Sequence, residues 1–351
     1  MKRIIPLILI FVLIFSACGK LADAAESPSP NTDTSPVVDE PTVEPTVYRN
    51  PLTGEVVDSE PANTRPYAFM INNIVYAQPQ CSVSDADIIY EILAEGDITR
   101  MMAIYSDISG IDVMGSIRSS RPYYIEIANS LDAIYVHAGG SEDAYAAISS
   151  KHINNIDGVR GAYSGTAFYR DPSRAAHGTE HSLFTSGERI LKATSDSGYR
   201  TEHEGDTFDY GLNFSDKVEM KNGAPANSLT VSFSGIKTTS FTYNAFGTYS
   251  AKQFDSNYID GNTGEDVQFK NILVLYAEHQ MLDSYGRRGI TLNATGTGHF
   301  ICDGEMVDII WSHAGDGETF HYSLADGTPL TLGVGKTYIA VVSPDSKITA
   351  E

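Results

Sequence analysis

The chain has 351 residues, a hydrophobic content of 42%, and 45 acidic against 24 basic side chains, which give a formal net charge of -21 at pH 7. A phosphate backbone binds to a basic face, so an acidic excess of this size argues against nucleic acid as a partner. The hydrophobic content is enough for the cores of one or two ordinary domains.

The first residues have the parts of a bacterial lipoprotein signal peptide. A basic start precedes an apolar run over residues 4–15, and Ser16-Ala17-Cys18-Gly19 supplies the small residues and the cysteine of a lipoprotein cleavage site. The apolar run is too short to span a bilayer as a helix. We therefore expect residues 1–17 to be removed and Cys18 to carry a lipid that holds the protein on the extracellular face of the cell membrane. The alternative is an ordinary secretory signal with an incidental cysteine.

Residues 18–50 are rich in proline, serine, threonine and acidic residues and have no repeating apolar face. Such a segment cannot bury enough apolar surface to offset its chain entropy, so we expect a disordered tether. Two domains are predicted after it, an α/β domain over residues 51–205 and a β-rich domain over residues 206–351.

Short apolar runs alternate with helix-like segments in the first predicted domain. Strands are predicted over residues 67–74, 87–95, 98–107, 112–117 and 132–138, and helices over residues 122–130, 142–150 and from about Thr185, which has capping-box spacing to Glu188. The Glu95-Gly96-Asp97 turn predicts a hairpin between two of these strands. The mixture of strands and helices predicts an α/β or α+β fold on a mixed sheet.

From about Tyr210 the sequence becomes a series of strand-like runs. Turn signals such as Asp303-Gly304 and Asp326-Gly327 separate them, which predicts a smaller, mostly-β domain in the form of a sandwich or curled sheet. Cys81 and Cys302 are far apart in the sequence; we expect two buried single thiols, with a disulfide as the alternative.

Two arginines precede the predicted helix at residues 122–130. Ser119 or Ser120 is its predicted N-cap, so Arg118 and Arg121 lie at the N-terminal end, where the helix dipole disfavours positive charge by about 0.3–1 kcal/mol at an exposed site. A compensating anion is therefore expected. Guanidinium groups and free backbone N–H groups together suit a phosphate, pyrophosphate or carboxylate.

Neighbouring segments extend this hypothesis. The predicted anion-binding set consists of Arg100, Arg118, Arg121, Arg170, Arg174 and His181. The alternative is a structural ion network in which the arginines pair with Glu91, Glu95, Asp132 and Asp171. The loop Gly139-Gly140-Ser141 ends a predicted strand, where α/β sheets place ligands, but a tight turn between strand and helix is the favoured explanation.

Motifs for catalysis and metal binding have little support. His177-Gly-Thr-Glu180-His181 has the H-x-x-E-H order of inverted zinc metallopeptidases, but Pro172 and Gly178 predict a loop rather than the helix that this chemistry needs. The S-x-x-K match at Ser234 to Lys237 has no companion motif, and Asp260 to Asp266 is better explained as a hairpin turn than as a calcium loop. We expect no metal and no other cofactor, and we assign no catalytic residue.

Several stretches together resemble the YerB-like lipoproteins of Gram-positive bacteria. They are RPYAFMINN from Arg65, ADIIYEILAEGDITRMMAIY from Ala86, GSIRSSRPYYIEIA from Gly115, DAIYVHAGGS from Asp132 and HSLFTS from His181. The resemblance covers nearly everything after the tether and implies an N-terminal and a C-terminal domain, both of unknown function. The chain departs from the family pattern at Ser116-Ile117, where Pro-Val is usual, and at Ser182 and Phe184, where Asn and Tyr are typical.

Two functional hypotheses follow from different classes of protein. The first is a binding lipoprotein of the cell envelope that recognises an anionic wall or lipid-linked ligand, or a protein partner. The second is a phosphotransferase or hydrolase that acts on lipid-linked cell-wall precursors, similar in chemistry to the LytR-CpsA-Psr phosphotransferases.

Overall fold

The computed structural model describes residues 47–61 and 63–351, which belong to one compact unit, Thr46–Glu351. The predicted signal peptide, the lipidation site Cys18 and most of the predicted tether lie outside the described residues. The prediction placed the end of the tether at residue 50, but Tyr48–Arg49 forms strand β1, which pairs with β2 (Val56–Val57). None of the helices in the described residues has the length and apolar content needed to cross a bilayer.

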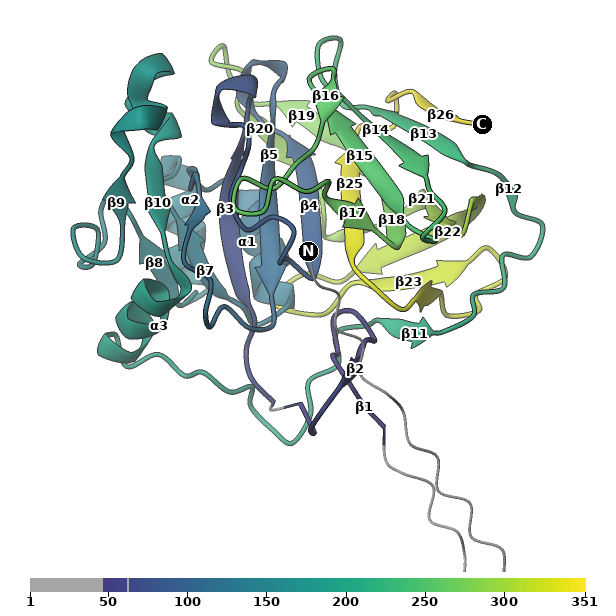
Figure 1. The fold of residues 1–351 in the computed structure, drawn as a ribbon, viewed down its shortest axis with the longest axis horizontal. Coiled ribbons are helices and arrows are strands. Elements are labelled where there is room, and N and C mark those ends of the chain that lie inside the picture. Colours follow the sequence, from purple (N-terminus) through teal and green to yellow (C-terminus); the bar gives the residue numbers. More distant parts are fainter. Residues whose placement is uncertain (1–46, 62) are drawn as a thin grey trace, which may run out of the picture. The chain divides into compact units, whose positions relative to one another are not determined.

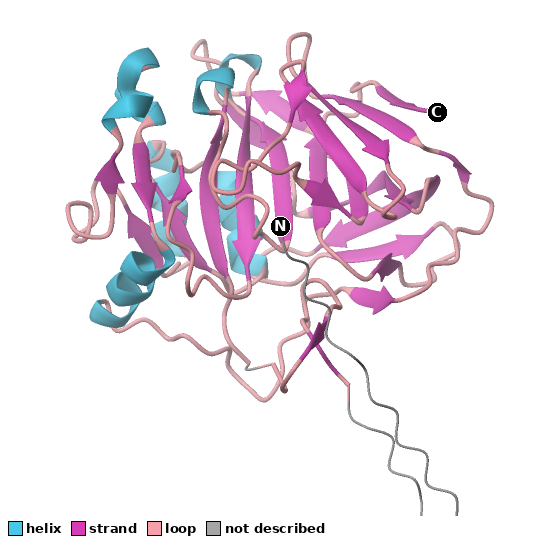
Figure 2. Cartoon of the chain, viewed as in Figure 1, coloured by secondary structure: helices cyan, strands magenta, loops and turns pink. Residues whose placement is uncertain are grey.

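A sheet of eleven strands contains strands from both halves of the sequence (Figures 1 and 2). The N-terminal half supplies β3 (Tyr67–Asn73), β4 (Ile88–Leu93), β5 (Thr99–Tyr105), β7 (Ile134–His137) and β8 (Asn155–Asp157). The C-terminal half supplies β12 (Ala224–Pro225), β18 (Asn271–Tyr276), β21 (Ala294–Cys302), β22 (Glu305–His313), β23 (His321–Leu324) and β25 (Thr337–Val342).

The strand order is β12-β22-β21-β18-β25-β4-β5-β3-β7-β8, with β23 beside β22. The two halves meet where β25 pairs in parallel with β4, with Thr337 opposite Ile88. An α/β N-terminal part and a β-rich C-terminal part are therefore both present, as predicted, and they share one sheet. The boundary between residues 205 and 206 stays a prediction.

Side chains alternate between the two faces of this sheet because successive residues of a strand point in opposite directions. The helices are α1 (Pro122–Ser130), α2 (Glu142–Ser150) and α3 (Gly187–Asp196). On β3, Ala68 and Met70 belong to one buried apolar cluster with Tyr124 of α1, whereas Phe69 belongs to another cluster with Ile190 of α3. Helices therefore pack against both faces.

A second sheet of six strands covers part of the α3 face. Its strands are β13 (Ser228–Ser232), β14 (Thr238–Tyr243), β15 (Tyr249–Gln253), β16 (Ser256–Asn257), β17 (Gln268–Phe269) and β26 (Ile348–Ala350). Leu229 and Val231 alternate with polar residues along β13, and with Phe241 they join the same buried cluster as Phe69. The predicted strands of the C-terminal half thus form two packed layers.

Shorter elements connect these layers. The remaining strands are β6 (Met114–Gly115), β9 (Tyr169–Arg170), β10 (Leu183–Thr185), β11 (Asn213–Ser215), β19 (His279–Met281), β20 (Arg288–Ile290) and β24 (Thr331–Gly333). The 3₁₀ helices are η1 (Val75–Ala77), η2 (Glu95–Asp97), η3 (Pro172–His177) and η4 (Thr179–His181).

Helices at residues 122–130 and 142–150 and the hairpin of β4 and β5 confirm the predictions. The predicted caps were wrong in two cases. Arg121 is the N-cap of α1 without a side-chain hydrogen bond, because the Ser120 hydroxyl instead contacts the hydroxyl of Tyr135 at 2.8 Å. The third helix is capped by Ser186, which follows Thr185 and accepts a hydrogen bond from the Arg189 N–H.

Candidate functional site

Arginine side chains meet one carboxylate at the turn between β4 and β5. Glu95 binds Arg100 of β5 with an Nη2–Oε2 distance of 2.9 Å and also binds the Nε of Arg121, the residue before α1. Arg118 lies within electrostatic reach of both arginines and of Glu95. We call these four residues the arginine cluster.

Arg118 is the member of the cluster whose guanidinium group has no hydrogen bond or ion pair to any residue that the structure describes. Burial, followed by the positive charge of Arg100, lowers the pKa of Arg118 to about 10. The group is still charged at neutral pH. Glu95 offsets one of the three positive charges of the cluster. The half-exposed Glu180 attracts Arg118 more strongly than Glu95 does, so two carboxylates face three guanidinium groups and positive charge remains in excess.

Arg100 is 5% exposed, and its Nε and Nη1 atoms are buried without a hydrogen-bond partner among the described residues. Burial also lowers the pKa of this guanidinium group. Leaving charged donors unsatisfied in a protein interior is unfavourable, and native structures usually avoid it. The cluster therefore contains both unbalanced charge and unused donors.

The position of Arg118 follows from the sheet. The Arg118 N–H donates to the Met70 carbonyl of β3, and the Arg118 carbonyl accepts a hydrogen bond from the Ala138 N–H just after β7, each at 2.9 Å. Residues 116–118 thus lie between β3 and the segment that follows β7. The parallel pairing of β3 with β7 ends at Phe69 and Val136, and Arg118 lies directly after it, at the carboxyl end of β7 and beside the middle of β3. Open α/β sheets hold ligands at the carboxyl ends of their strands.

Arg170 and Arg174, two other members of the predicted anion-binding set, have different contacts. Arg170 donates from Nη1 to the Thr179 carbonyl at 2.5 Å, and Arg174 donates to the carbonyls of Gln78 and Pro79 at 3.2 and 2.9 Å. Both guanidinium groups hold loops in place through backbone oxygens. We therefore do not include them in the arginine cluster.

His181 borders the cluster but is not on an α-helix. The segment predicted as a loop contains two short 3₁₀ helices, η3 and η4, which Gly178 (φ +131°) separates, so His177 and His181 do not share the α-helix that the zinc motif needs. The His181 Nδ1 lies 2.9 Å from the Nδ2 of Asn72, and burial lowers the pKa of His181. Within residues 47–61 and 63–351, no three His, Cys, Asp or Glu side chains are arranged to hold a metal ion.

The glycine loop after β7 forms internal hydrogen bonds. The Gly139 N–H donates to Oδ1 of Asp157 at 2.8 Å, and the Ser141 hydroxyl caps α2 by accepting from the Ala144 N–H at 3.2 Å. Gly140 pairs with Ser120 in the segment before α1. These contacts fit the tight-turn explanation, and a ligand role for Gly139, Gly140 and Ser141 stays a prediction.

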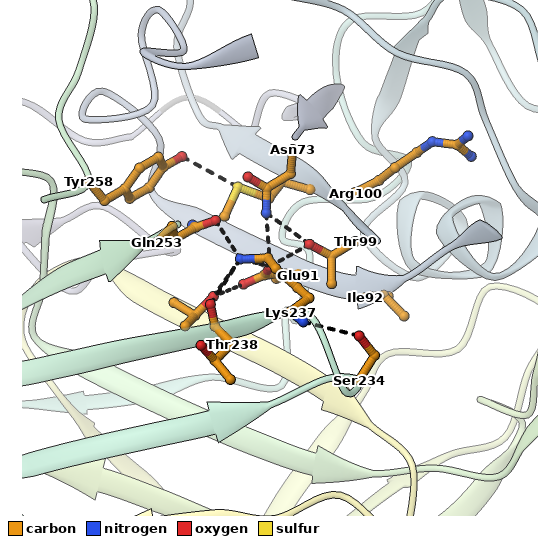
Figure 3. A network of polar contacts seen from close by, with 12 residues as sticks. Asn73, Glu91, Ile92, Thr99, Arg100, Ser234, Lys237, Thr238, Gln253 and Tyr258 are labelled. Atoms are coloured by element: carbon orange, nitrogen blue, oxygen red, sulfur yellow. Dashed lines mark hydrogen bonds and ion pairs between the residues drawn. The ribbon is translucent and has the colours of Figure 1, made fainter. Parts of the chain in front are cut away.

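A second polar network lies on the opposite face of the same hairpin (Figure 3). Glu91 of β4 and Lys237, just before β14, are both buried and form an ion pair at 2.9 Å. Glu91 also accepts hydrogen bonds from Asn73 at 2.8 Å and Thr99 at 2.5 Å, as well as from Thr239 and Tyr338. The figure shows the Arg100 side chain extending away from this network.

The remaining sequence motifs are explained structurally. Ser234 of the S-x-x-K match donates to the Asp97 carbonyl, while Lys237 is bound to Glu91, so the two side chains do not form a catalytic pair. Asp260 closes a hairpin turn, because its N–H donates to the Glu265 carbonyl. Cys81 and Cys302 are buried free thiols rather than a disulfide.

The structure thus describes a strand-rich α/β protein with a cationic cluster between the turn of the β4–β5 hairpin and the carboxyl end of β7. Family models described as "Protein of unknown function (DUF3048)" match it, the N-terminal domain over residues 52–200 and the C-terminal domain over residues 229–339. The chain belongs to this family, which confirms the resemblance seen in the sequence.

Two comparisons with Bacillus subtilis agree with that assignment. The chain is 30% identical over 315 residues to a protein of strain 168 named "Putative lipoprotein YerB", with 84% of this chain and 86% of the relative covered. The crystal structure of the YerB protein from the same species has 29% sequence identity and a TM-score of 0.74, and the match covers 86% of this chain and 99% of the other.

Proposed function

We propose that this protein is a membrane-anchored lipoprotein on the extracellular face of the cell membrane, and that its arginine cluster binds an anionic ligand of the cell envelope. The anchor rests on the predicted lipid at Cys18 and on the name of the Bacillus subtilis relative. The binding role rests on the unbalanced positive charge around Arg118.

The charge of the cluster is the observation that carries the proposal. Arg100 and Arg121 bind the carboxylate of Glu95, and Arg118, which has no ion pair among the described residues, lies within electrostatic reach of both arginines, in a chain whose formal net charge is -21. Like charges held together in a partly buried position repel one another strongly, because solvent screening is weak there. A bound anion would replace this repulsion with charge-assisted hydrogen bonds.

The geometry favours binding over the phosphotransferase or hydrolase alternative. Enzymes of that kind need carboxylates that can bind a divalent cation beside the substrate phosphates. Glu95 is already bound by two arginines, and within the described residues neither Glu95 nor Glu180 belongs to a group of three side chains that could hold a metal ion. We therefore assign no catalytic residue.

The test is calorimetric titration of the soluble chain 46–351 with inorganic pyrophosphate at low ionic strength, where screening is weakest. This part forms one compact unit with its own core, and the similar crystal structure from Bacillus subtilis is matched over 99% of its length by this chain. Loss of a hydrogen bond to a charged group costs about 1.5–3 kcal/mol, so Arg118→Ala should weaken binding about 10- to 100-fold.

The matched control is Arg189→Ala on α3, because Arg189 is exposed and bonds only to the Thr166 carbonyl through its guanidinium group among the described residues. Both variants should have melting temperatures close to that of the native chain. Pyrophosphate affinity that is the same in Arg118→Ala as in the native chain would show that the anion binds elsewhere.

A further inference from the structure

Exposed apolar side chains lie on two loops that both contact the turn of the arginine cluster. They are Ile236, Met281, Leu282 and Tyr285, which are 75%, 60%, 52% and 82% exposed. The last three lie on the hairpin of β19 and β20, and Ile236 lies in the turn between β13 and β14. We call these four residues the hairpin patch.

Both loops of the hairpin patch bind the turn that carries Glu95. Arg288 of β20 forms an ion pair with Asp97 at 2.6 Å and donates to the Ala94 carbonyl at 3.3 Å. Ser234, two residues before Ile236, donates to the Asp97 carbonyl at 2.8 Å. The apolar patch and the cationic cluster therefore lie on neighbouring sides of one short turn.

We infer that the ligand of the arginine cluster is an amphiphile, a phosphate ester with an apolar chain. This inference rests on the proposed function, since the phosphate would bind at the arginine cluster and the apolar chain would cover the hairpin patch. A free inorganic anion would leave the patch exposed, and contiguous apolar patches on soluble proteins usually mark binding sites. The arginines would bind the phosphate of such a molecule, and the neighbouring apolar side chains would contact its apolar chain.

A single amphiphile fits better than the surface of an anionic bilayer. The net charge of -21 repels such a surface. The patch also lies at the opposite end of β4 from the start of the described chain, because Asn50 contacts Asp87 before β4 at 3.2 Å, whereas Arg288 binds Asp97 after it. Figure 1 shows β1 and β2 at the lower end of the ribbon and β19 and β20 at the upper end.

The experiment compares inorganic phosphate with dodecyl phosphate, kept below its micelle concentration, by calorimetry on the chain 46–351. We expect dodecyl phosphate to bind at least about tenfold more tightly, which corresponds to about 1.4 kcal/mol. The double variant Met281→Ser and Leu282→Ser should lower the affinity for dodecyl phosphate to that for phosphate and leave phosphate binding unchanged. Phe246→Ser removes an exposed aromatic ring from the turn at the opposite end of β14 from Ile236 and serves as the control.

The outcomes separate this inference from the proposed function. If phosphate binds in an Arg118-dependent way but dodecyl phosphate binds no more tightly, the amphiphile inference fails and the anion site stands. If neither probe binds, the anion site itself fails. Binding to phosphatidylglycerol vesicles without affinity for monomeric dodecyl phosphate would overturn the inference in favour of a membrane surface.

Discussion

Replacing Lys237 by methionine should destabilise the whole compact unit. Lys237 comes from the C-terminal half of the sequence and Glu91 from the N-terminal half, and both are buried where the two sheets meet. Without Lys237, the Glu91 carboxylate would keep hydrogen bonds from neutral donors but lose its counterion. Removing one partner of a buried ion pair usually costs about 3–5 kcal/mol, because an uncompensated charge remains in the interior.

Urea unfolding followed by the fluorescence of Trp311, the single buried tryptophan, measures this loss. If the free energy of unfolding decreases by roughly 3 kcal/mol per molar urea, the urea midpoint of Lys237→Met should be about 1–1.7 M lower than that of the native chain. The double variant Glu91→Gln and Lys237→Met removes both charges. We expect it to recover most of the loss, because hydrophobic or neutral replacements of a whole buried pair are tolerated.

Lys252→Met on the neighbouring strand β15 is the matched control, since Lys252 is exposed and its replacement should change the free energy of unfolding by no more than about 0.5 kcal/mol. If Lys237→Met lowered the free energy of unfolding by no more than this control, the ion pair would not hold the sheets together. A double variant less stable than Lys237→Met would contradict the charge argument.

Two other predictions concern packing and thiol chemistry. A β-carbon at Gly187 would lie 1.7 Å from the Ile108 carbonyl oxygen, so Gly187→Ala should sharply lower the yield of folded protein, whereas Gly165→Ala, with nothing within 4 Å, should express normally. Cys81 and Cys302 are buried, and burial raises the pKa of the Cys302 thiol to about 12. Neither thiol of the native chain 46–351 should react with an aromatic disulfide reagent at pH 8, and both should react in denaturant; rapid reaction of the native protein would contradict their burial.

The local elements were predictable because their signals lie within a few residues. Pro122 fixes the first turn of α1, Ser141 caps α2, and the Glu95-Gly96-Asp97 turn joins two apolar runs. The two caps that were wrong involve hydroxyl groups with other partners, and the Thr185 hydroxyl donates to the Ala167 carbonyl at 2.6 Å. Ser120 contacts Tyr135 across the core, and no local pattern contains that contact.

The long-range features were not predictable from one sequence. The parallel pairing of β25 with β4 joins segments about 250 residues apart, which the sequence pattern had assigned to separate domains. In the arginine cluster, Arg118 and Arg121 could be identified because they precede a predicted helix, and Glu95 was predicted as a possible pairing partner. Only the fold shows that Glu95 binds two arginines at once and that Arg170 binds a carbonyl instead.

The hairpin of β4 and β5 connects stability with the proposed binding site. Thr99 binds Glu91 on one face, and the next residue, Arg100, points to the other face and binds Glu95. The buried ion pair therefore fixes the strands from which the arginine cluster extends. Because the cluster is held in place, its positive charges repel one another before any ligand binds, and an incoming anion removes that repulsion without reordering the site. Rigid support and unbalanced charge together are the reasons for proposing that this turn binds an anion.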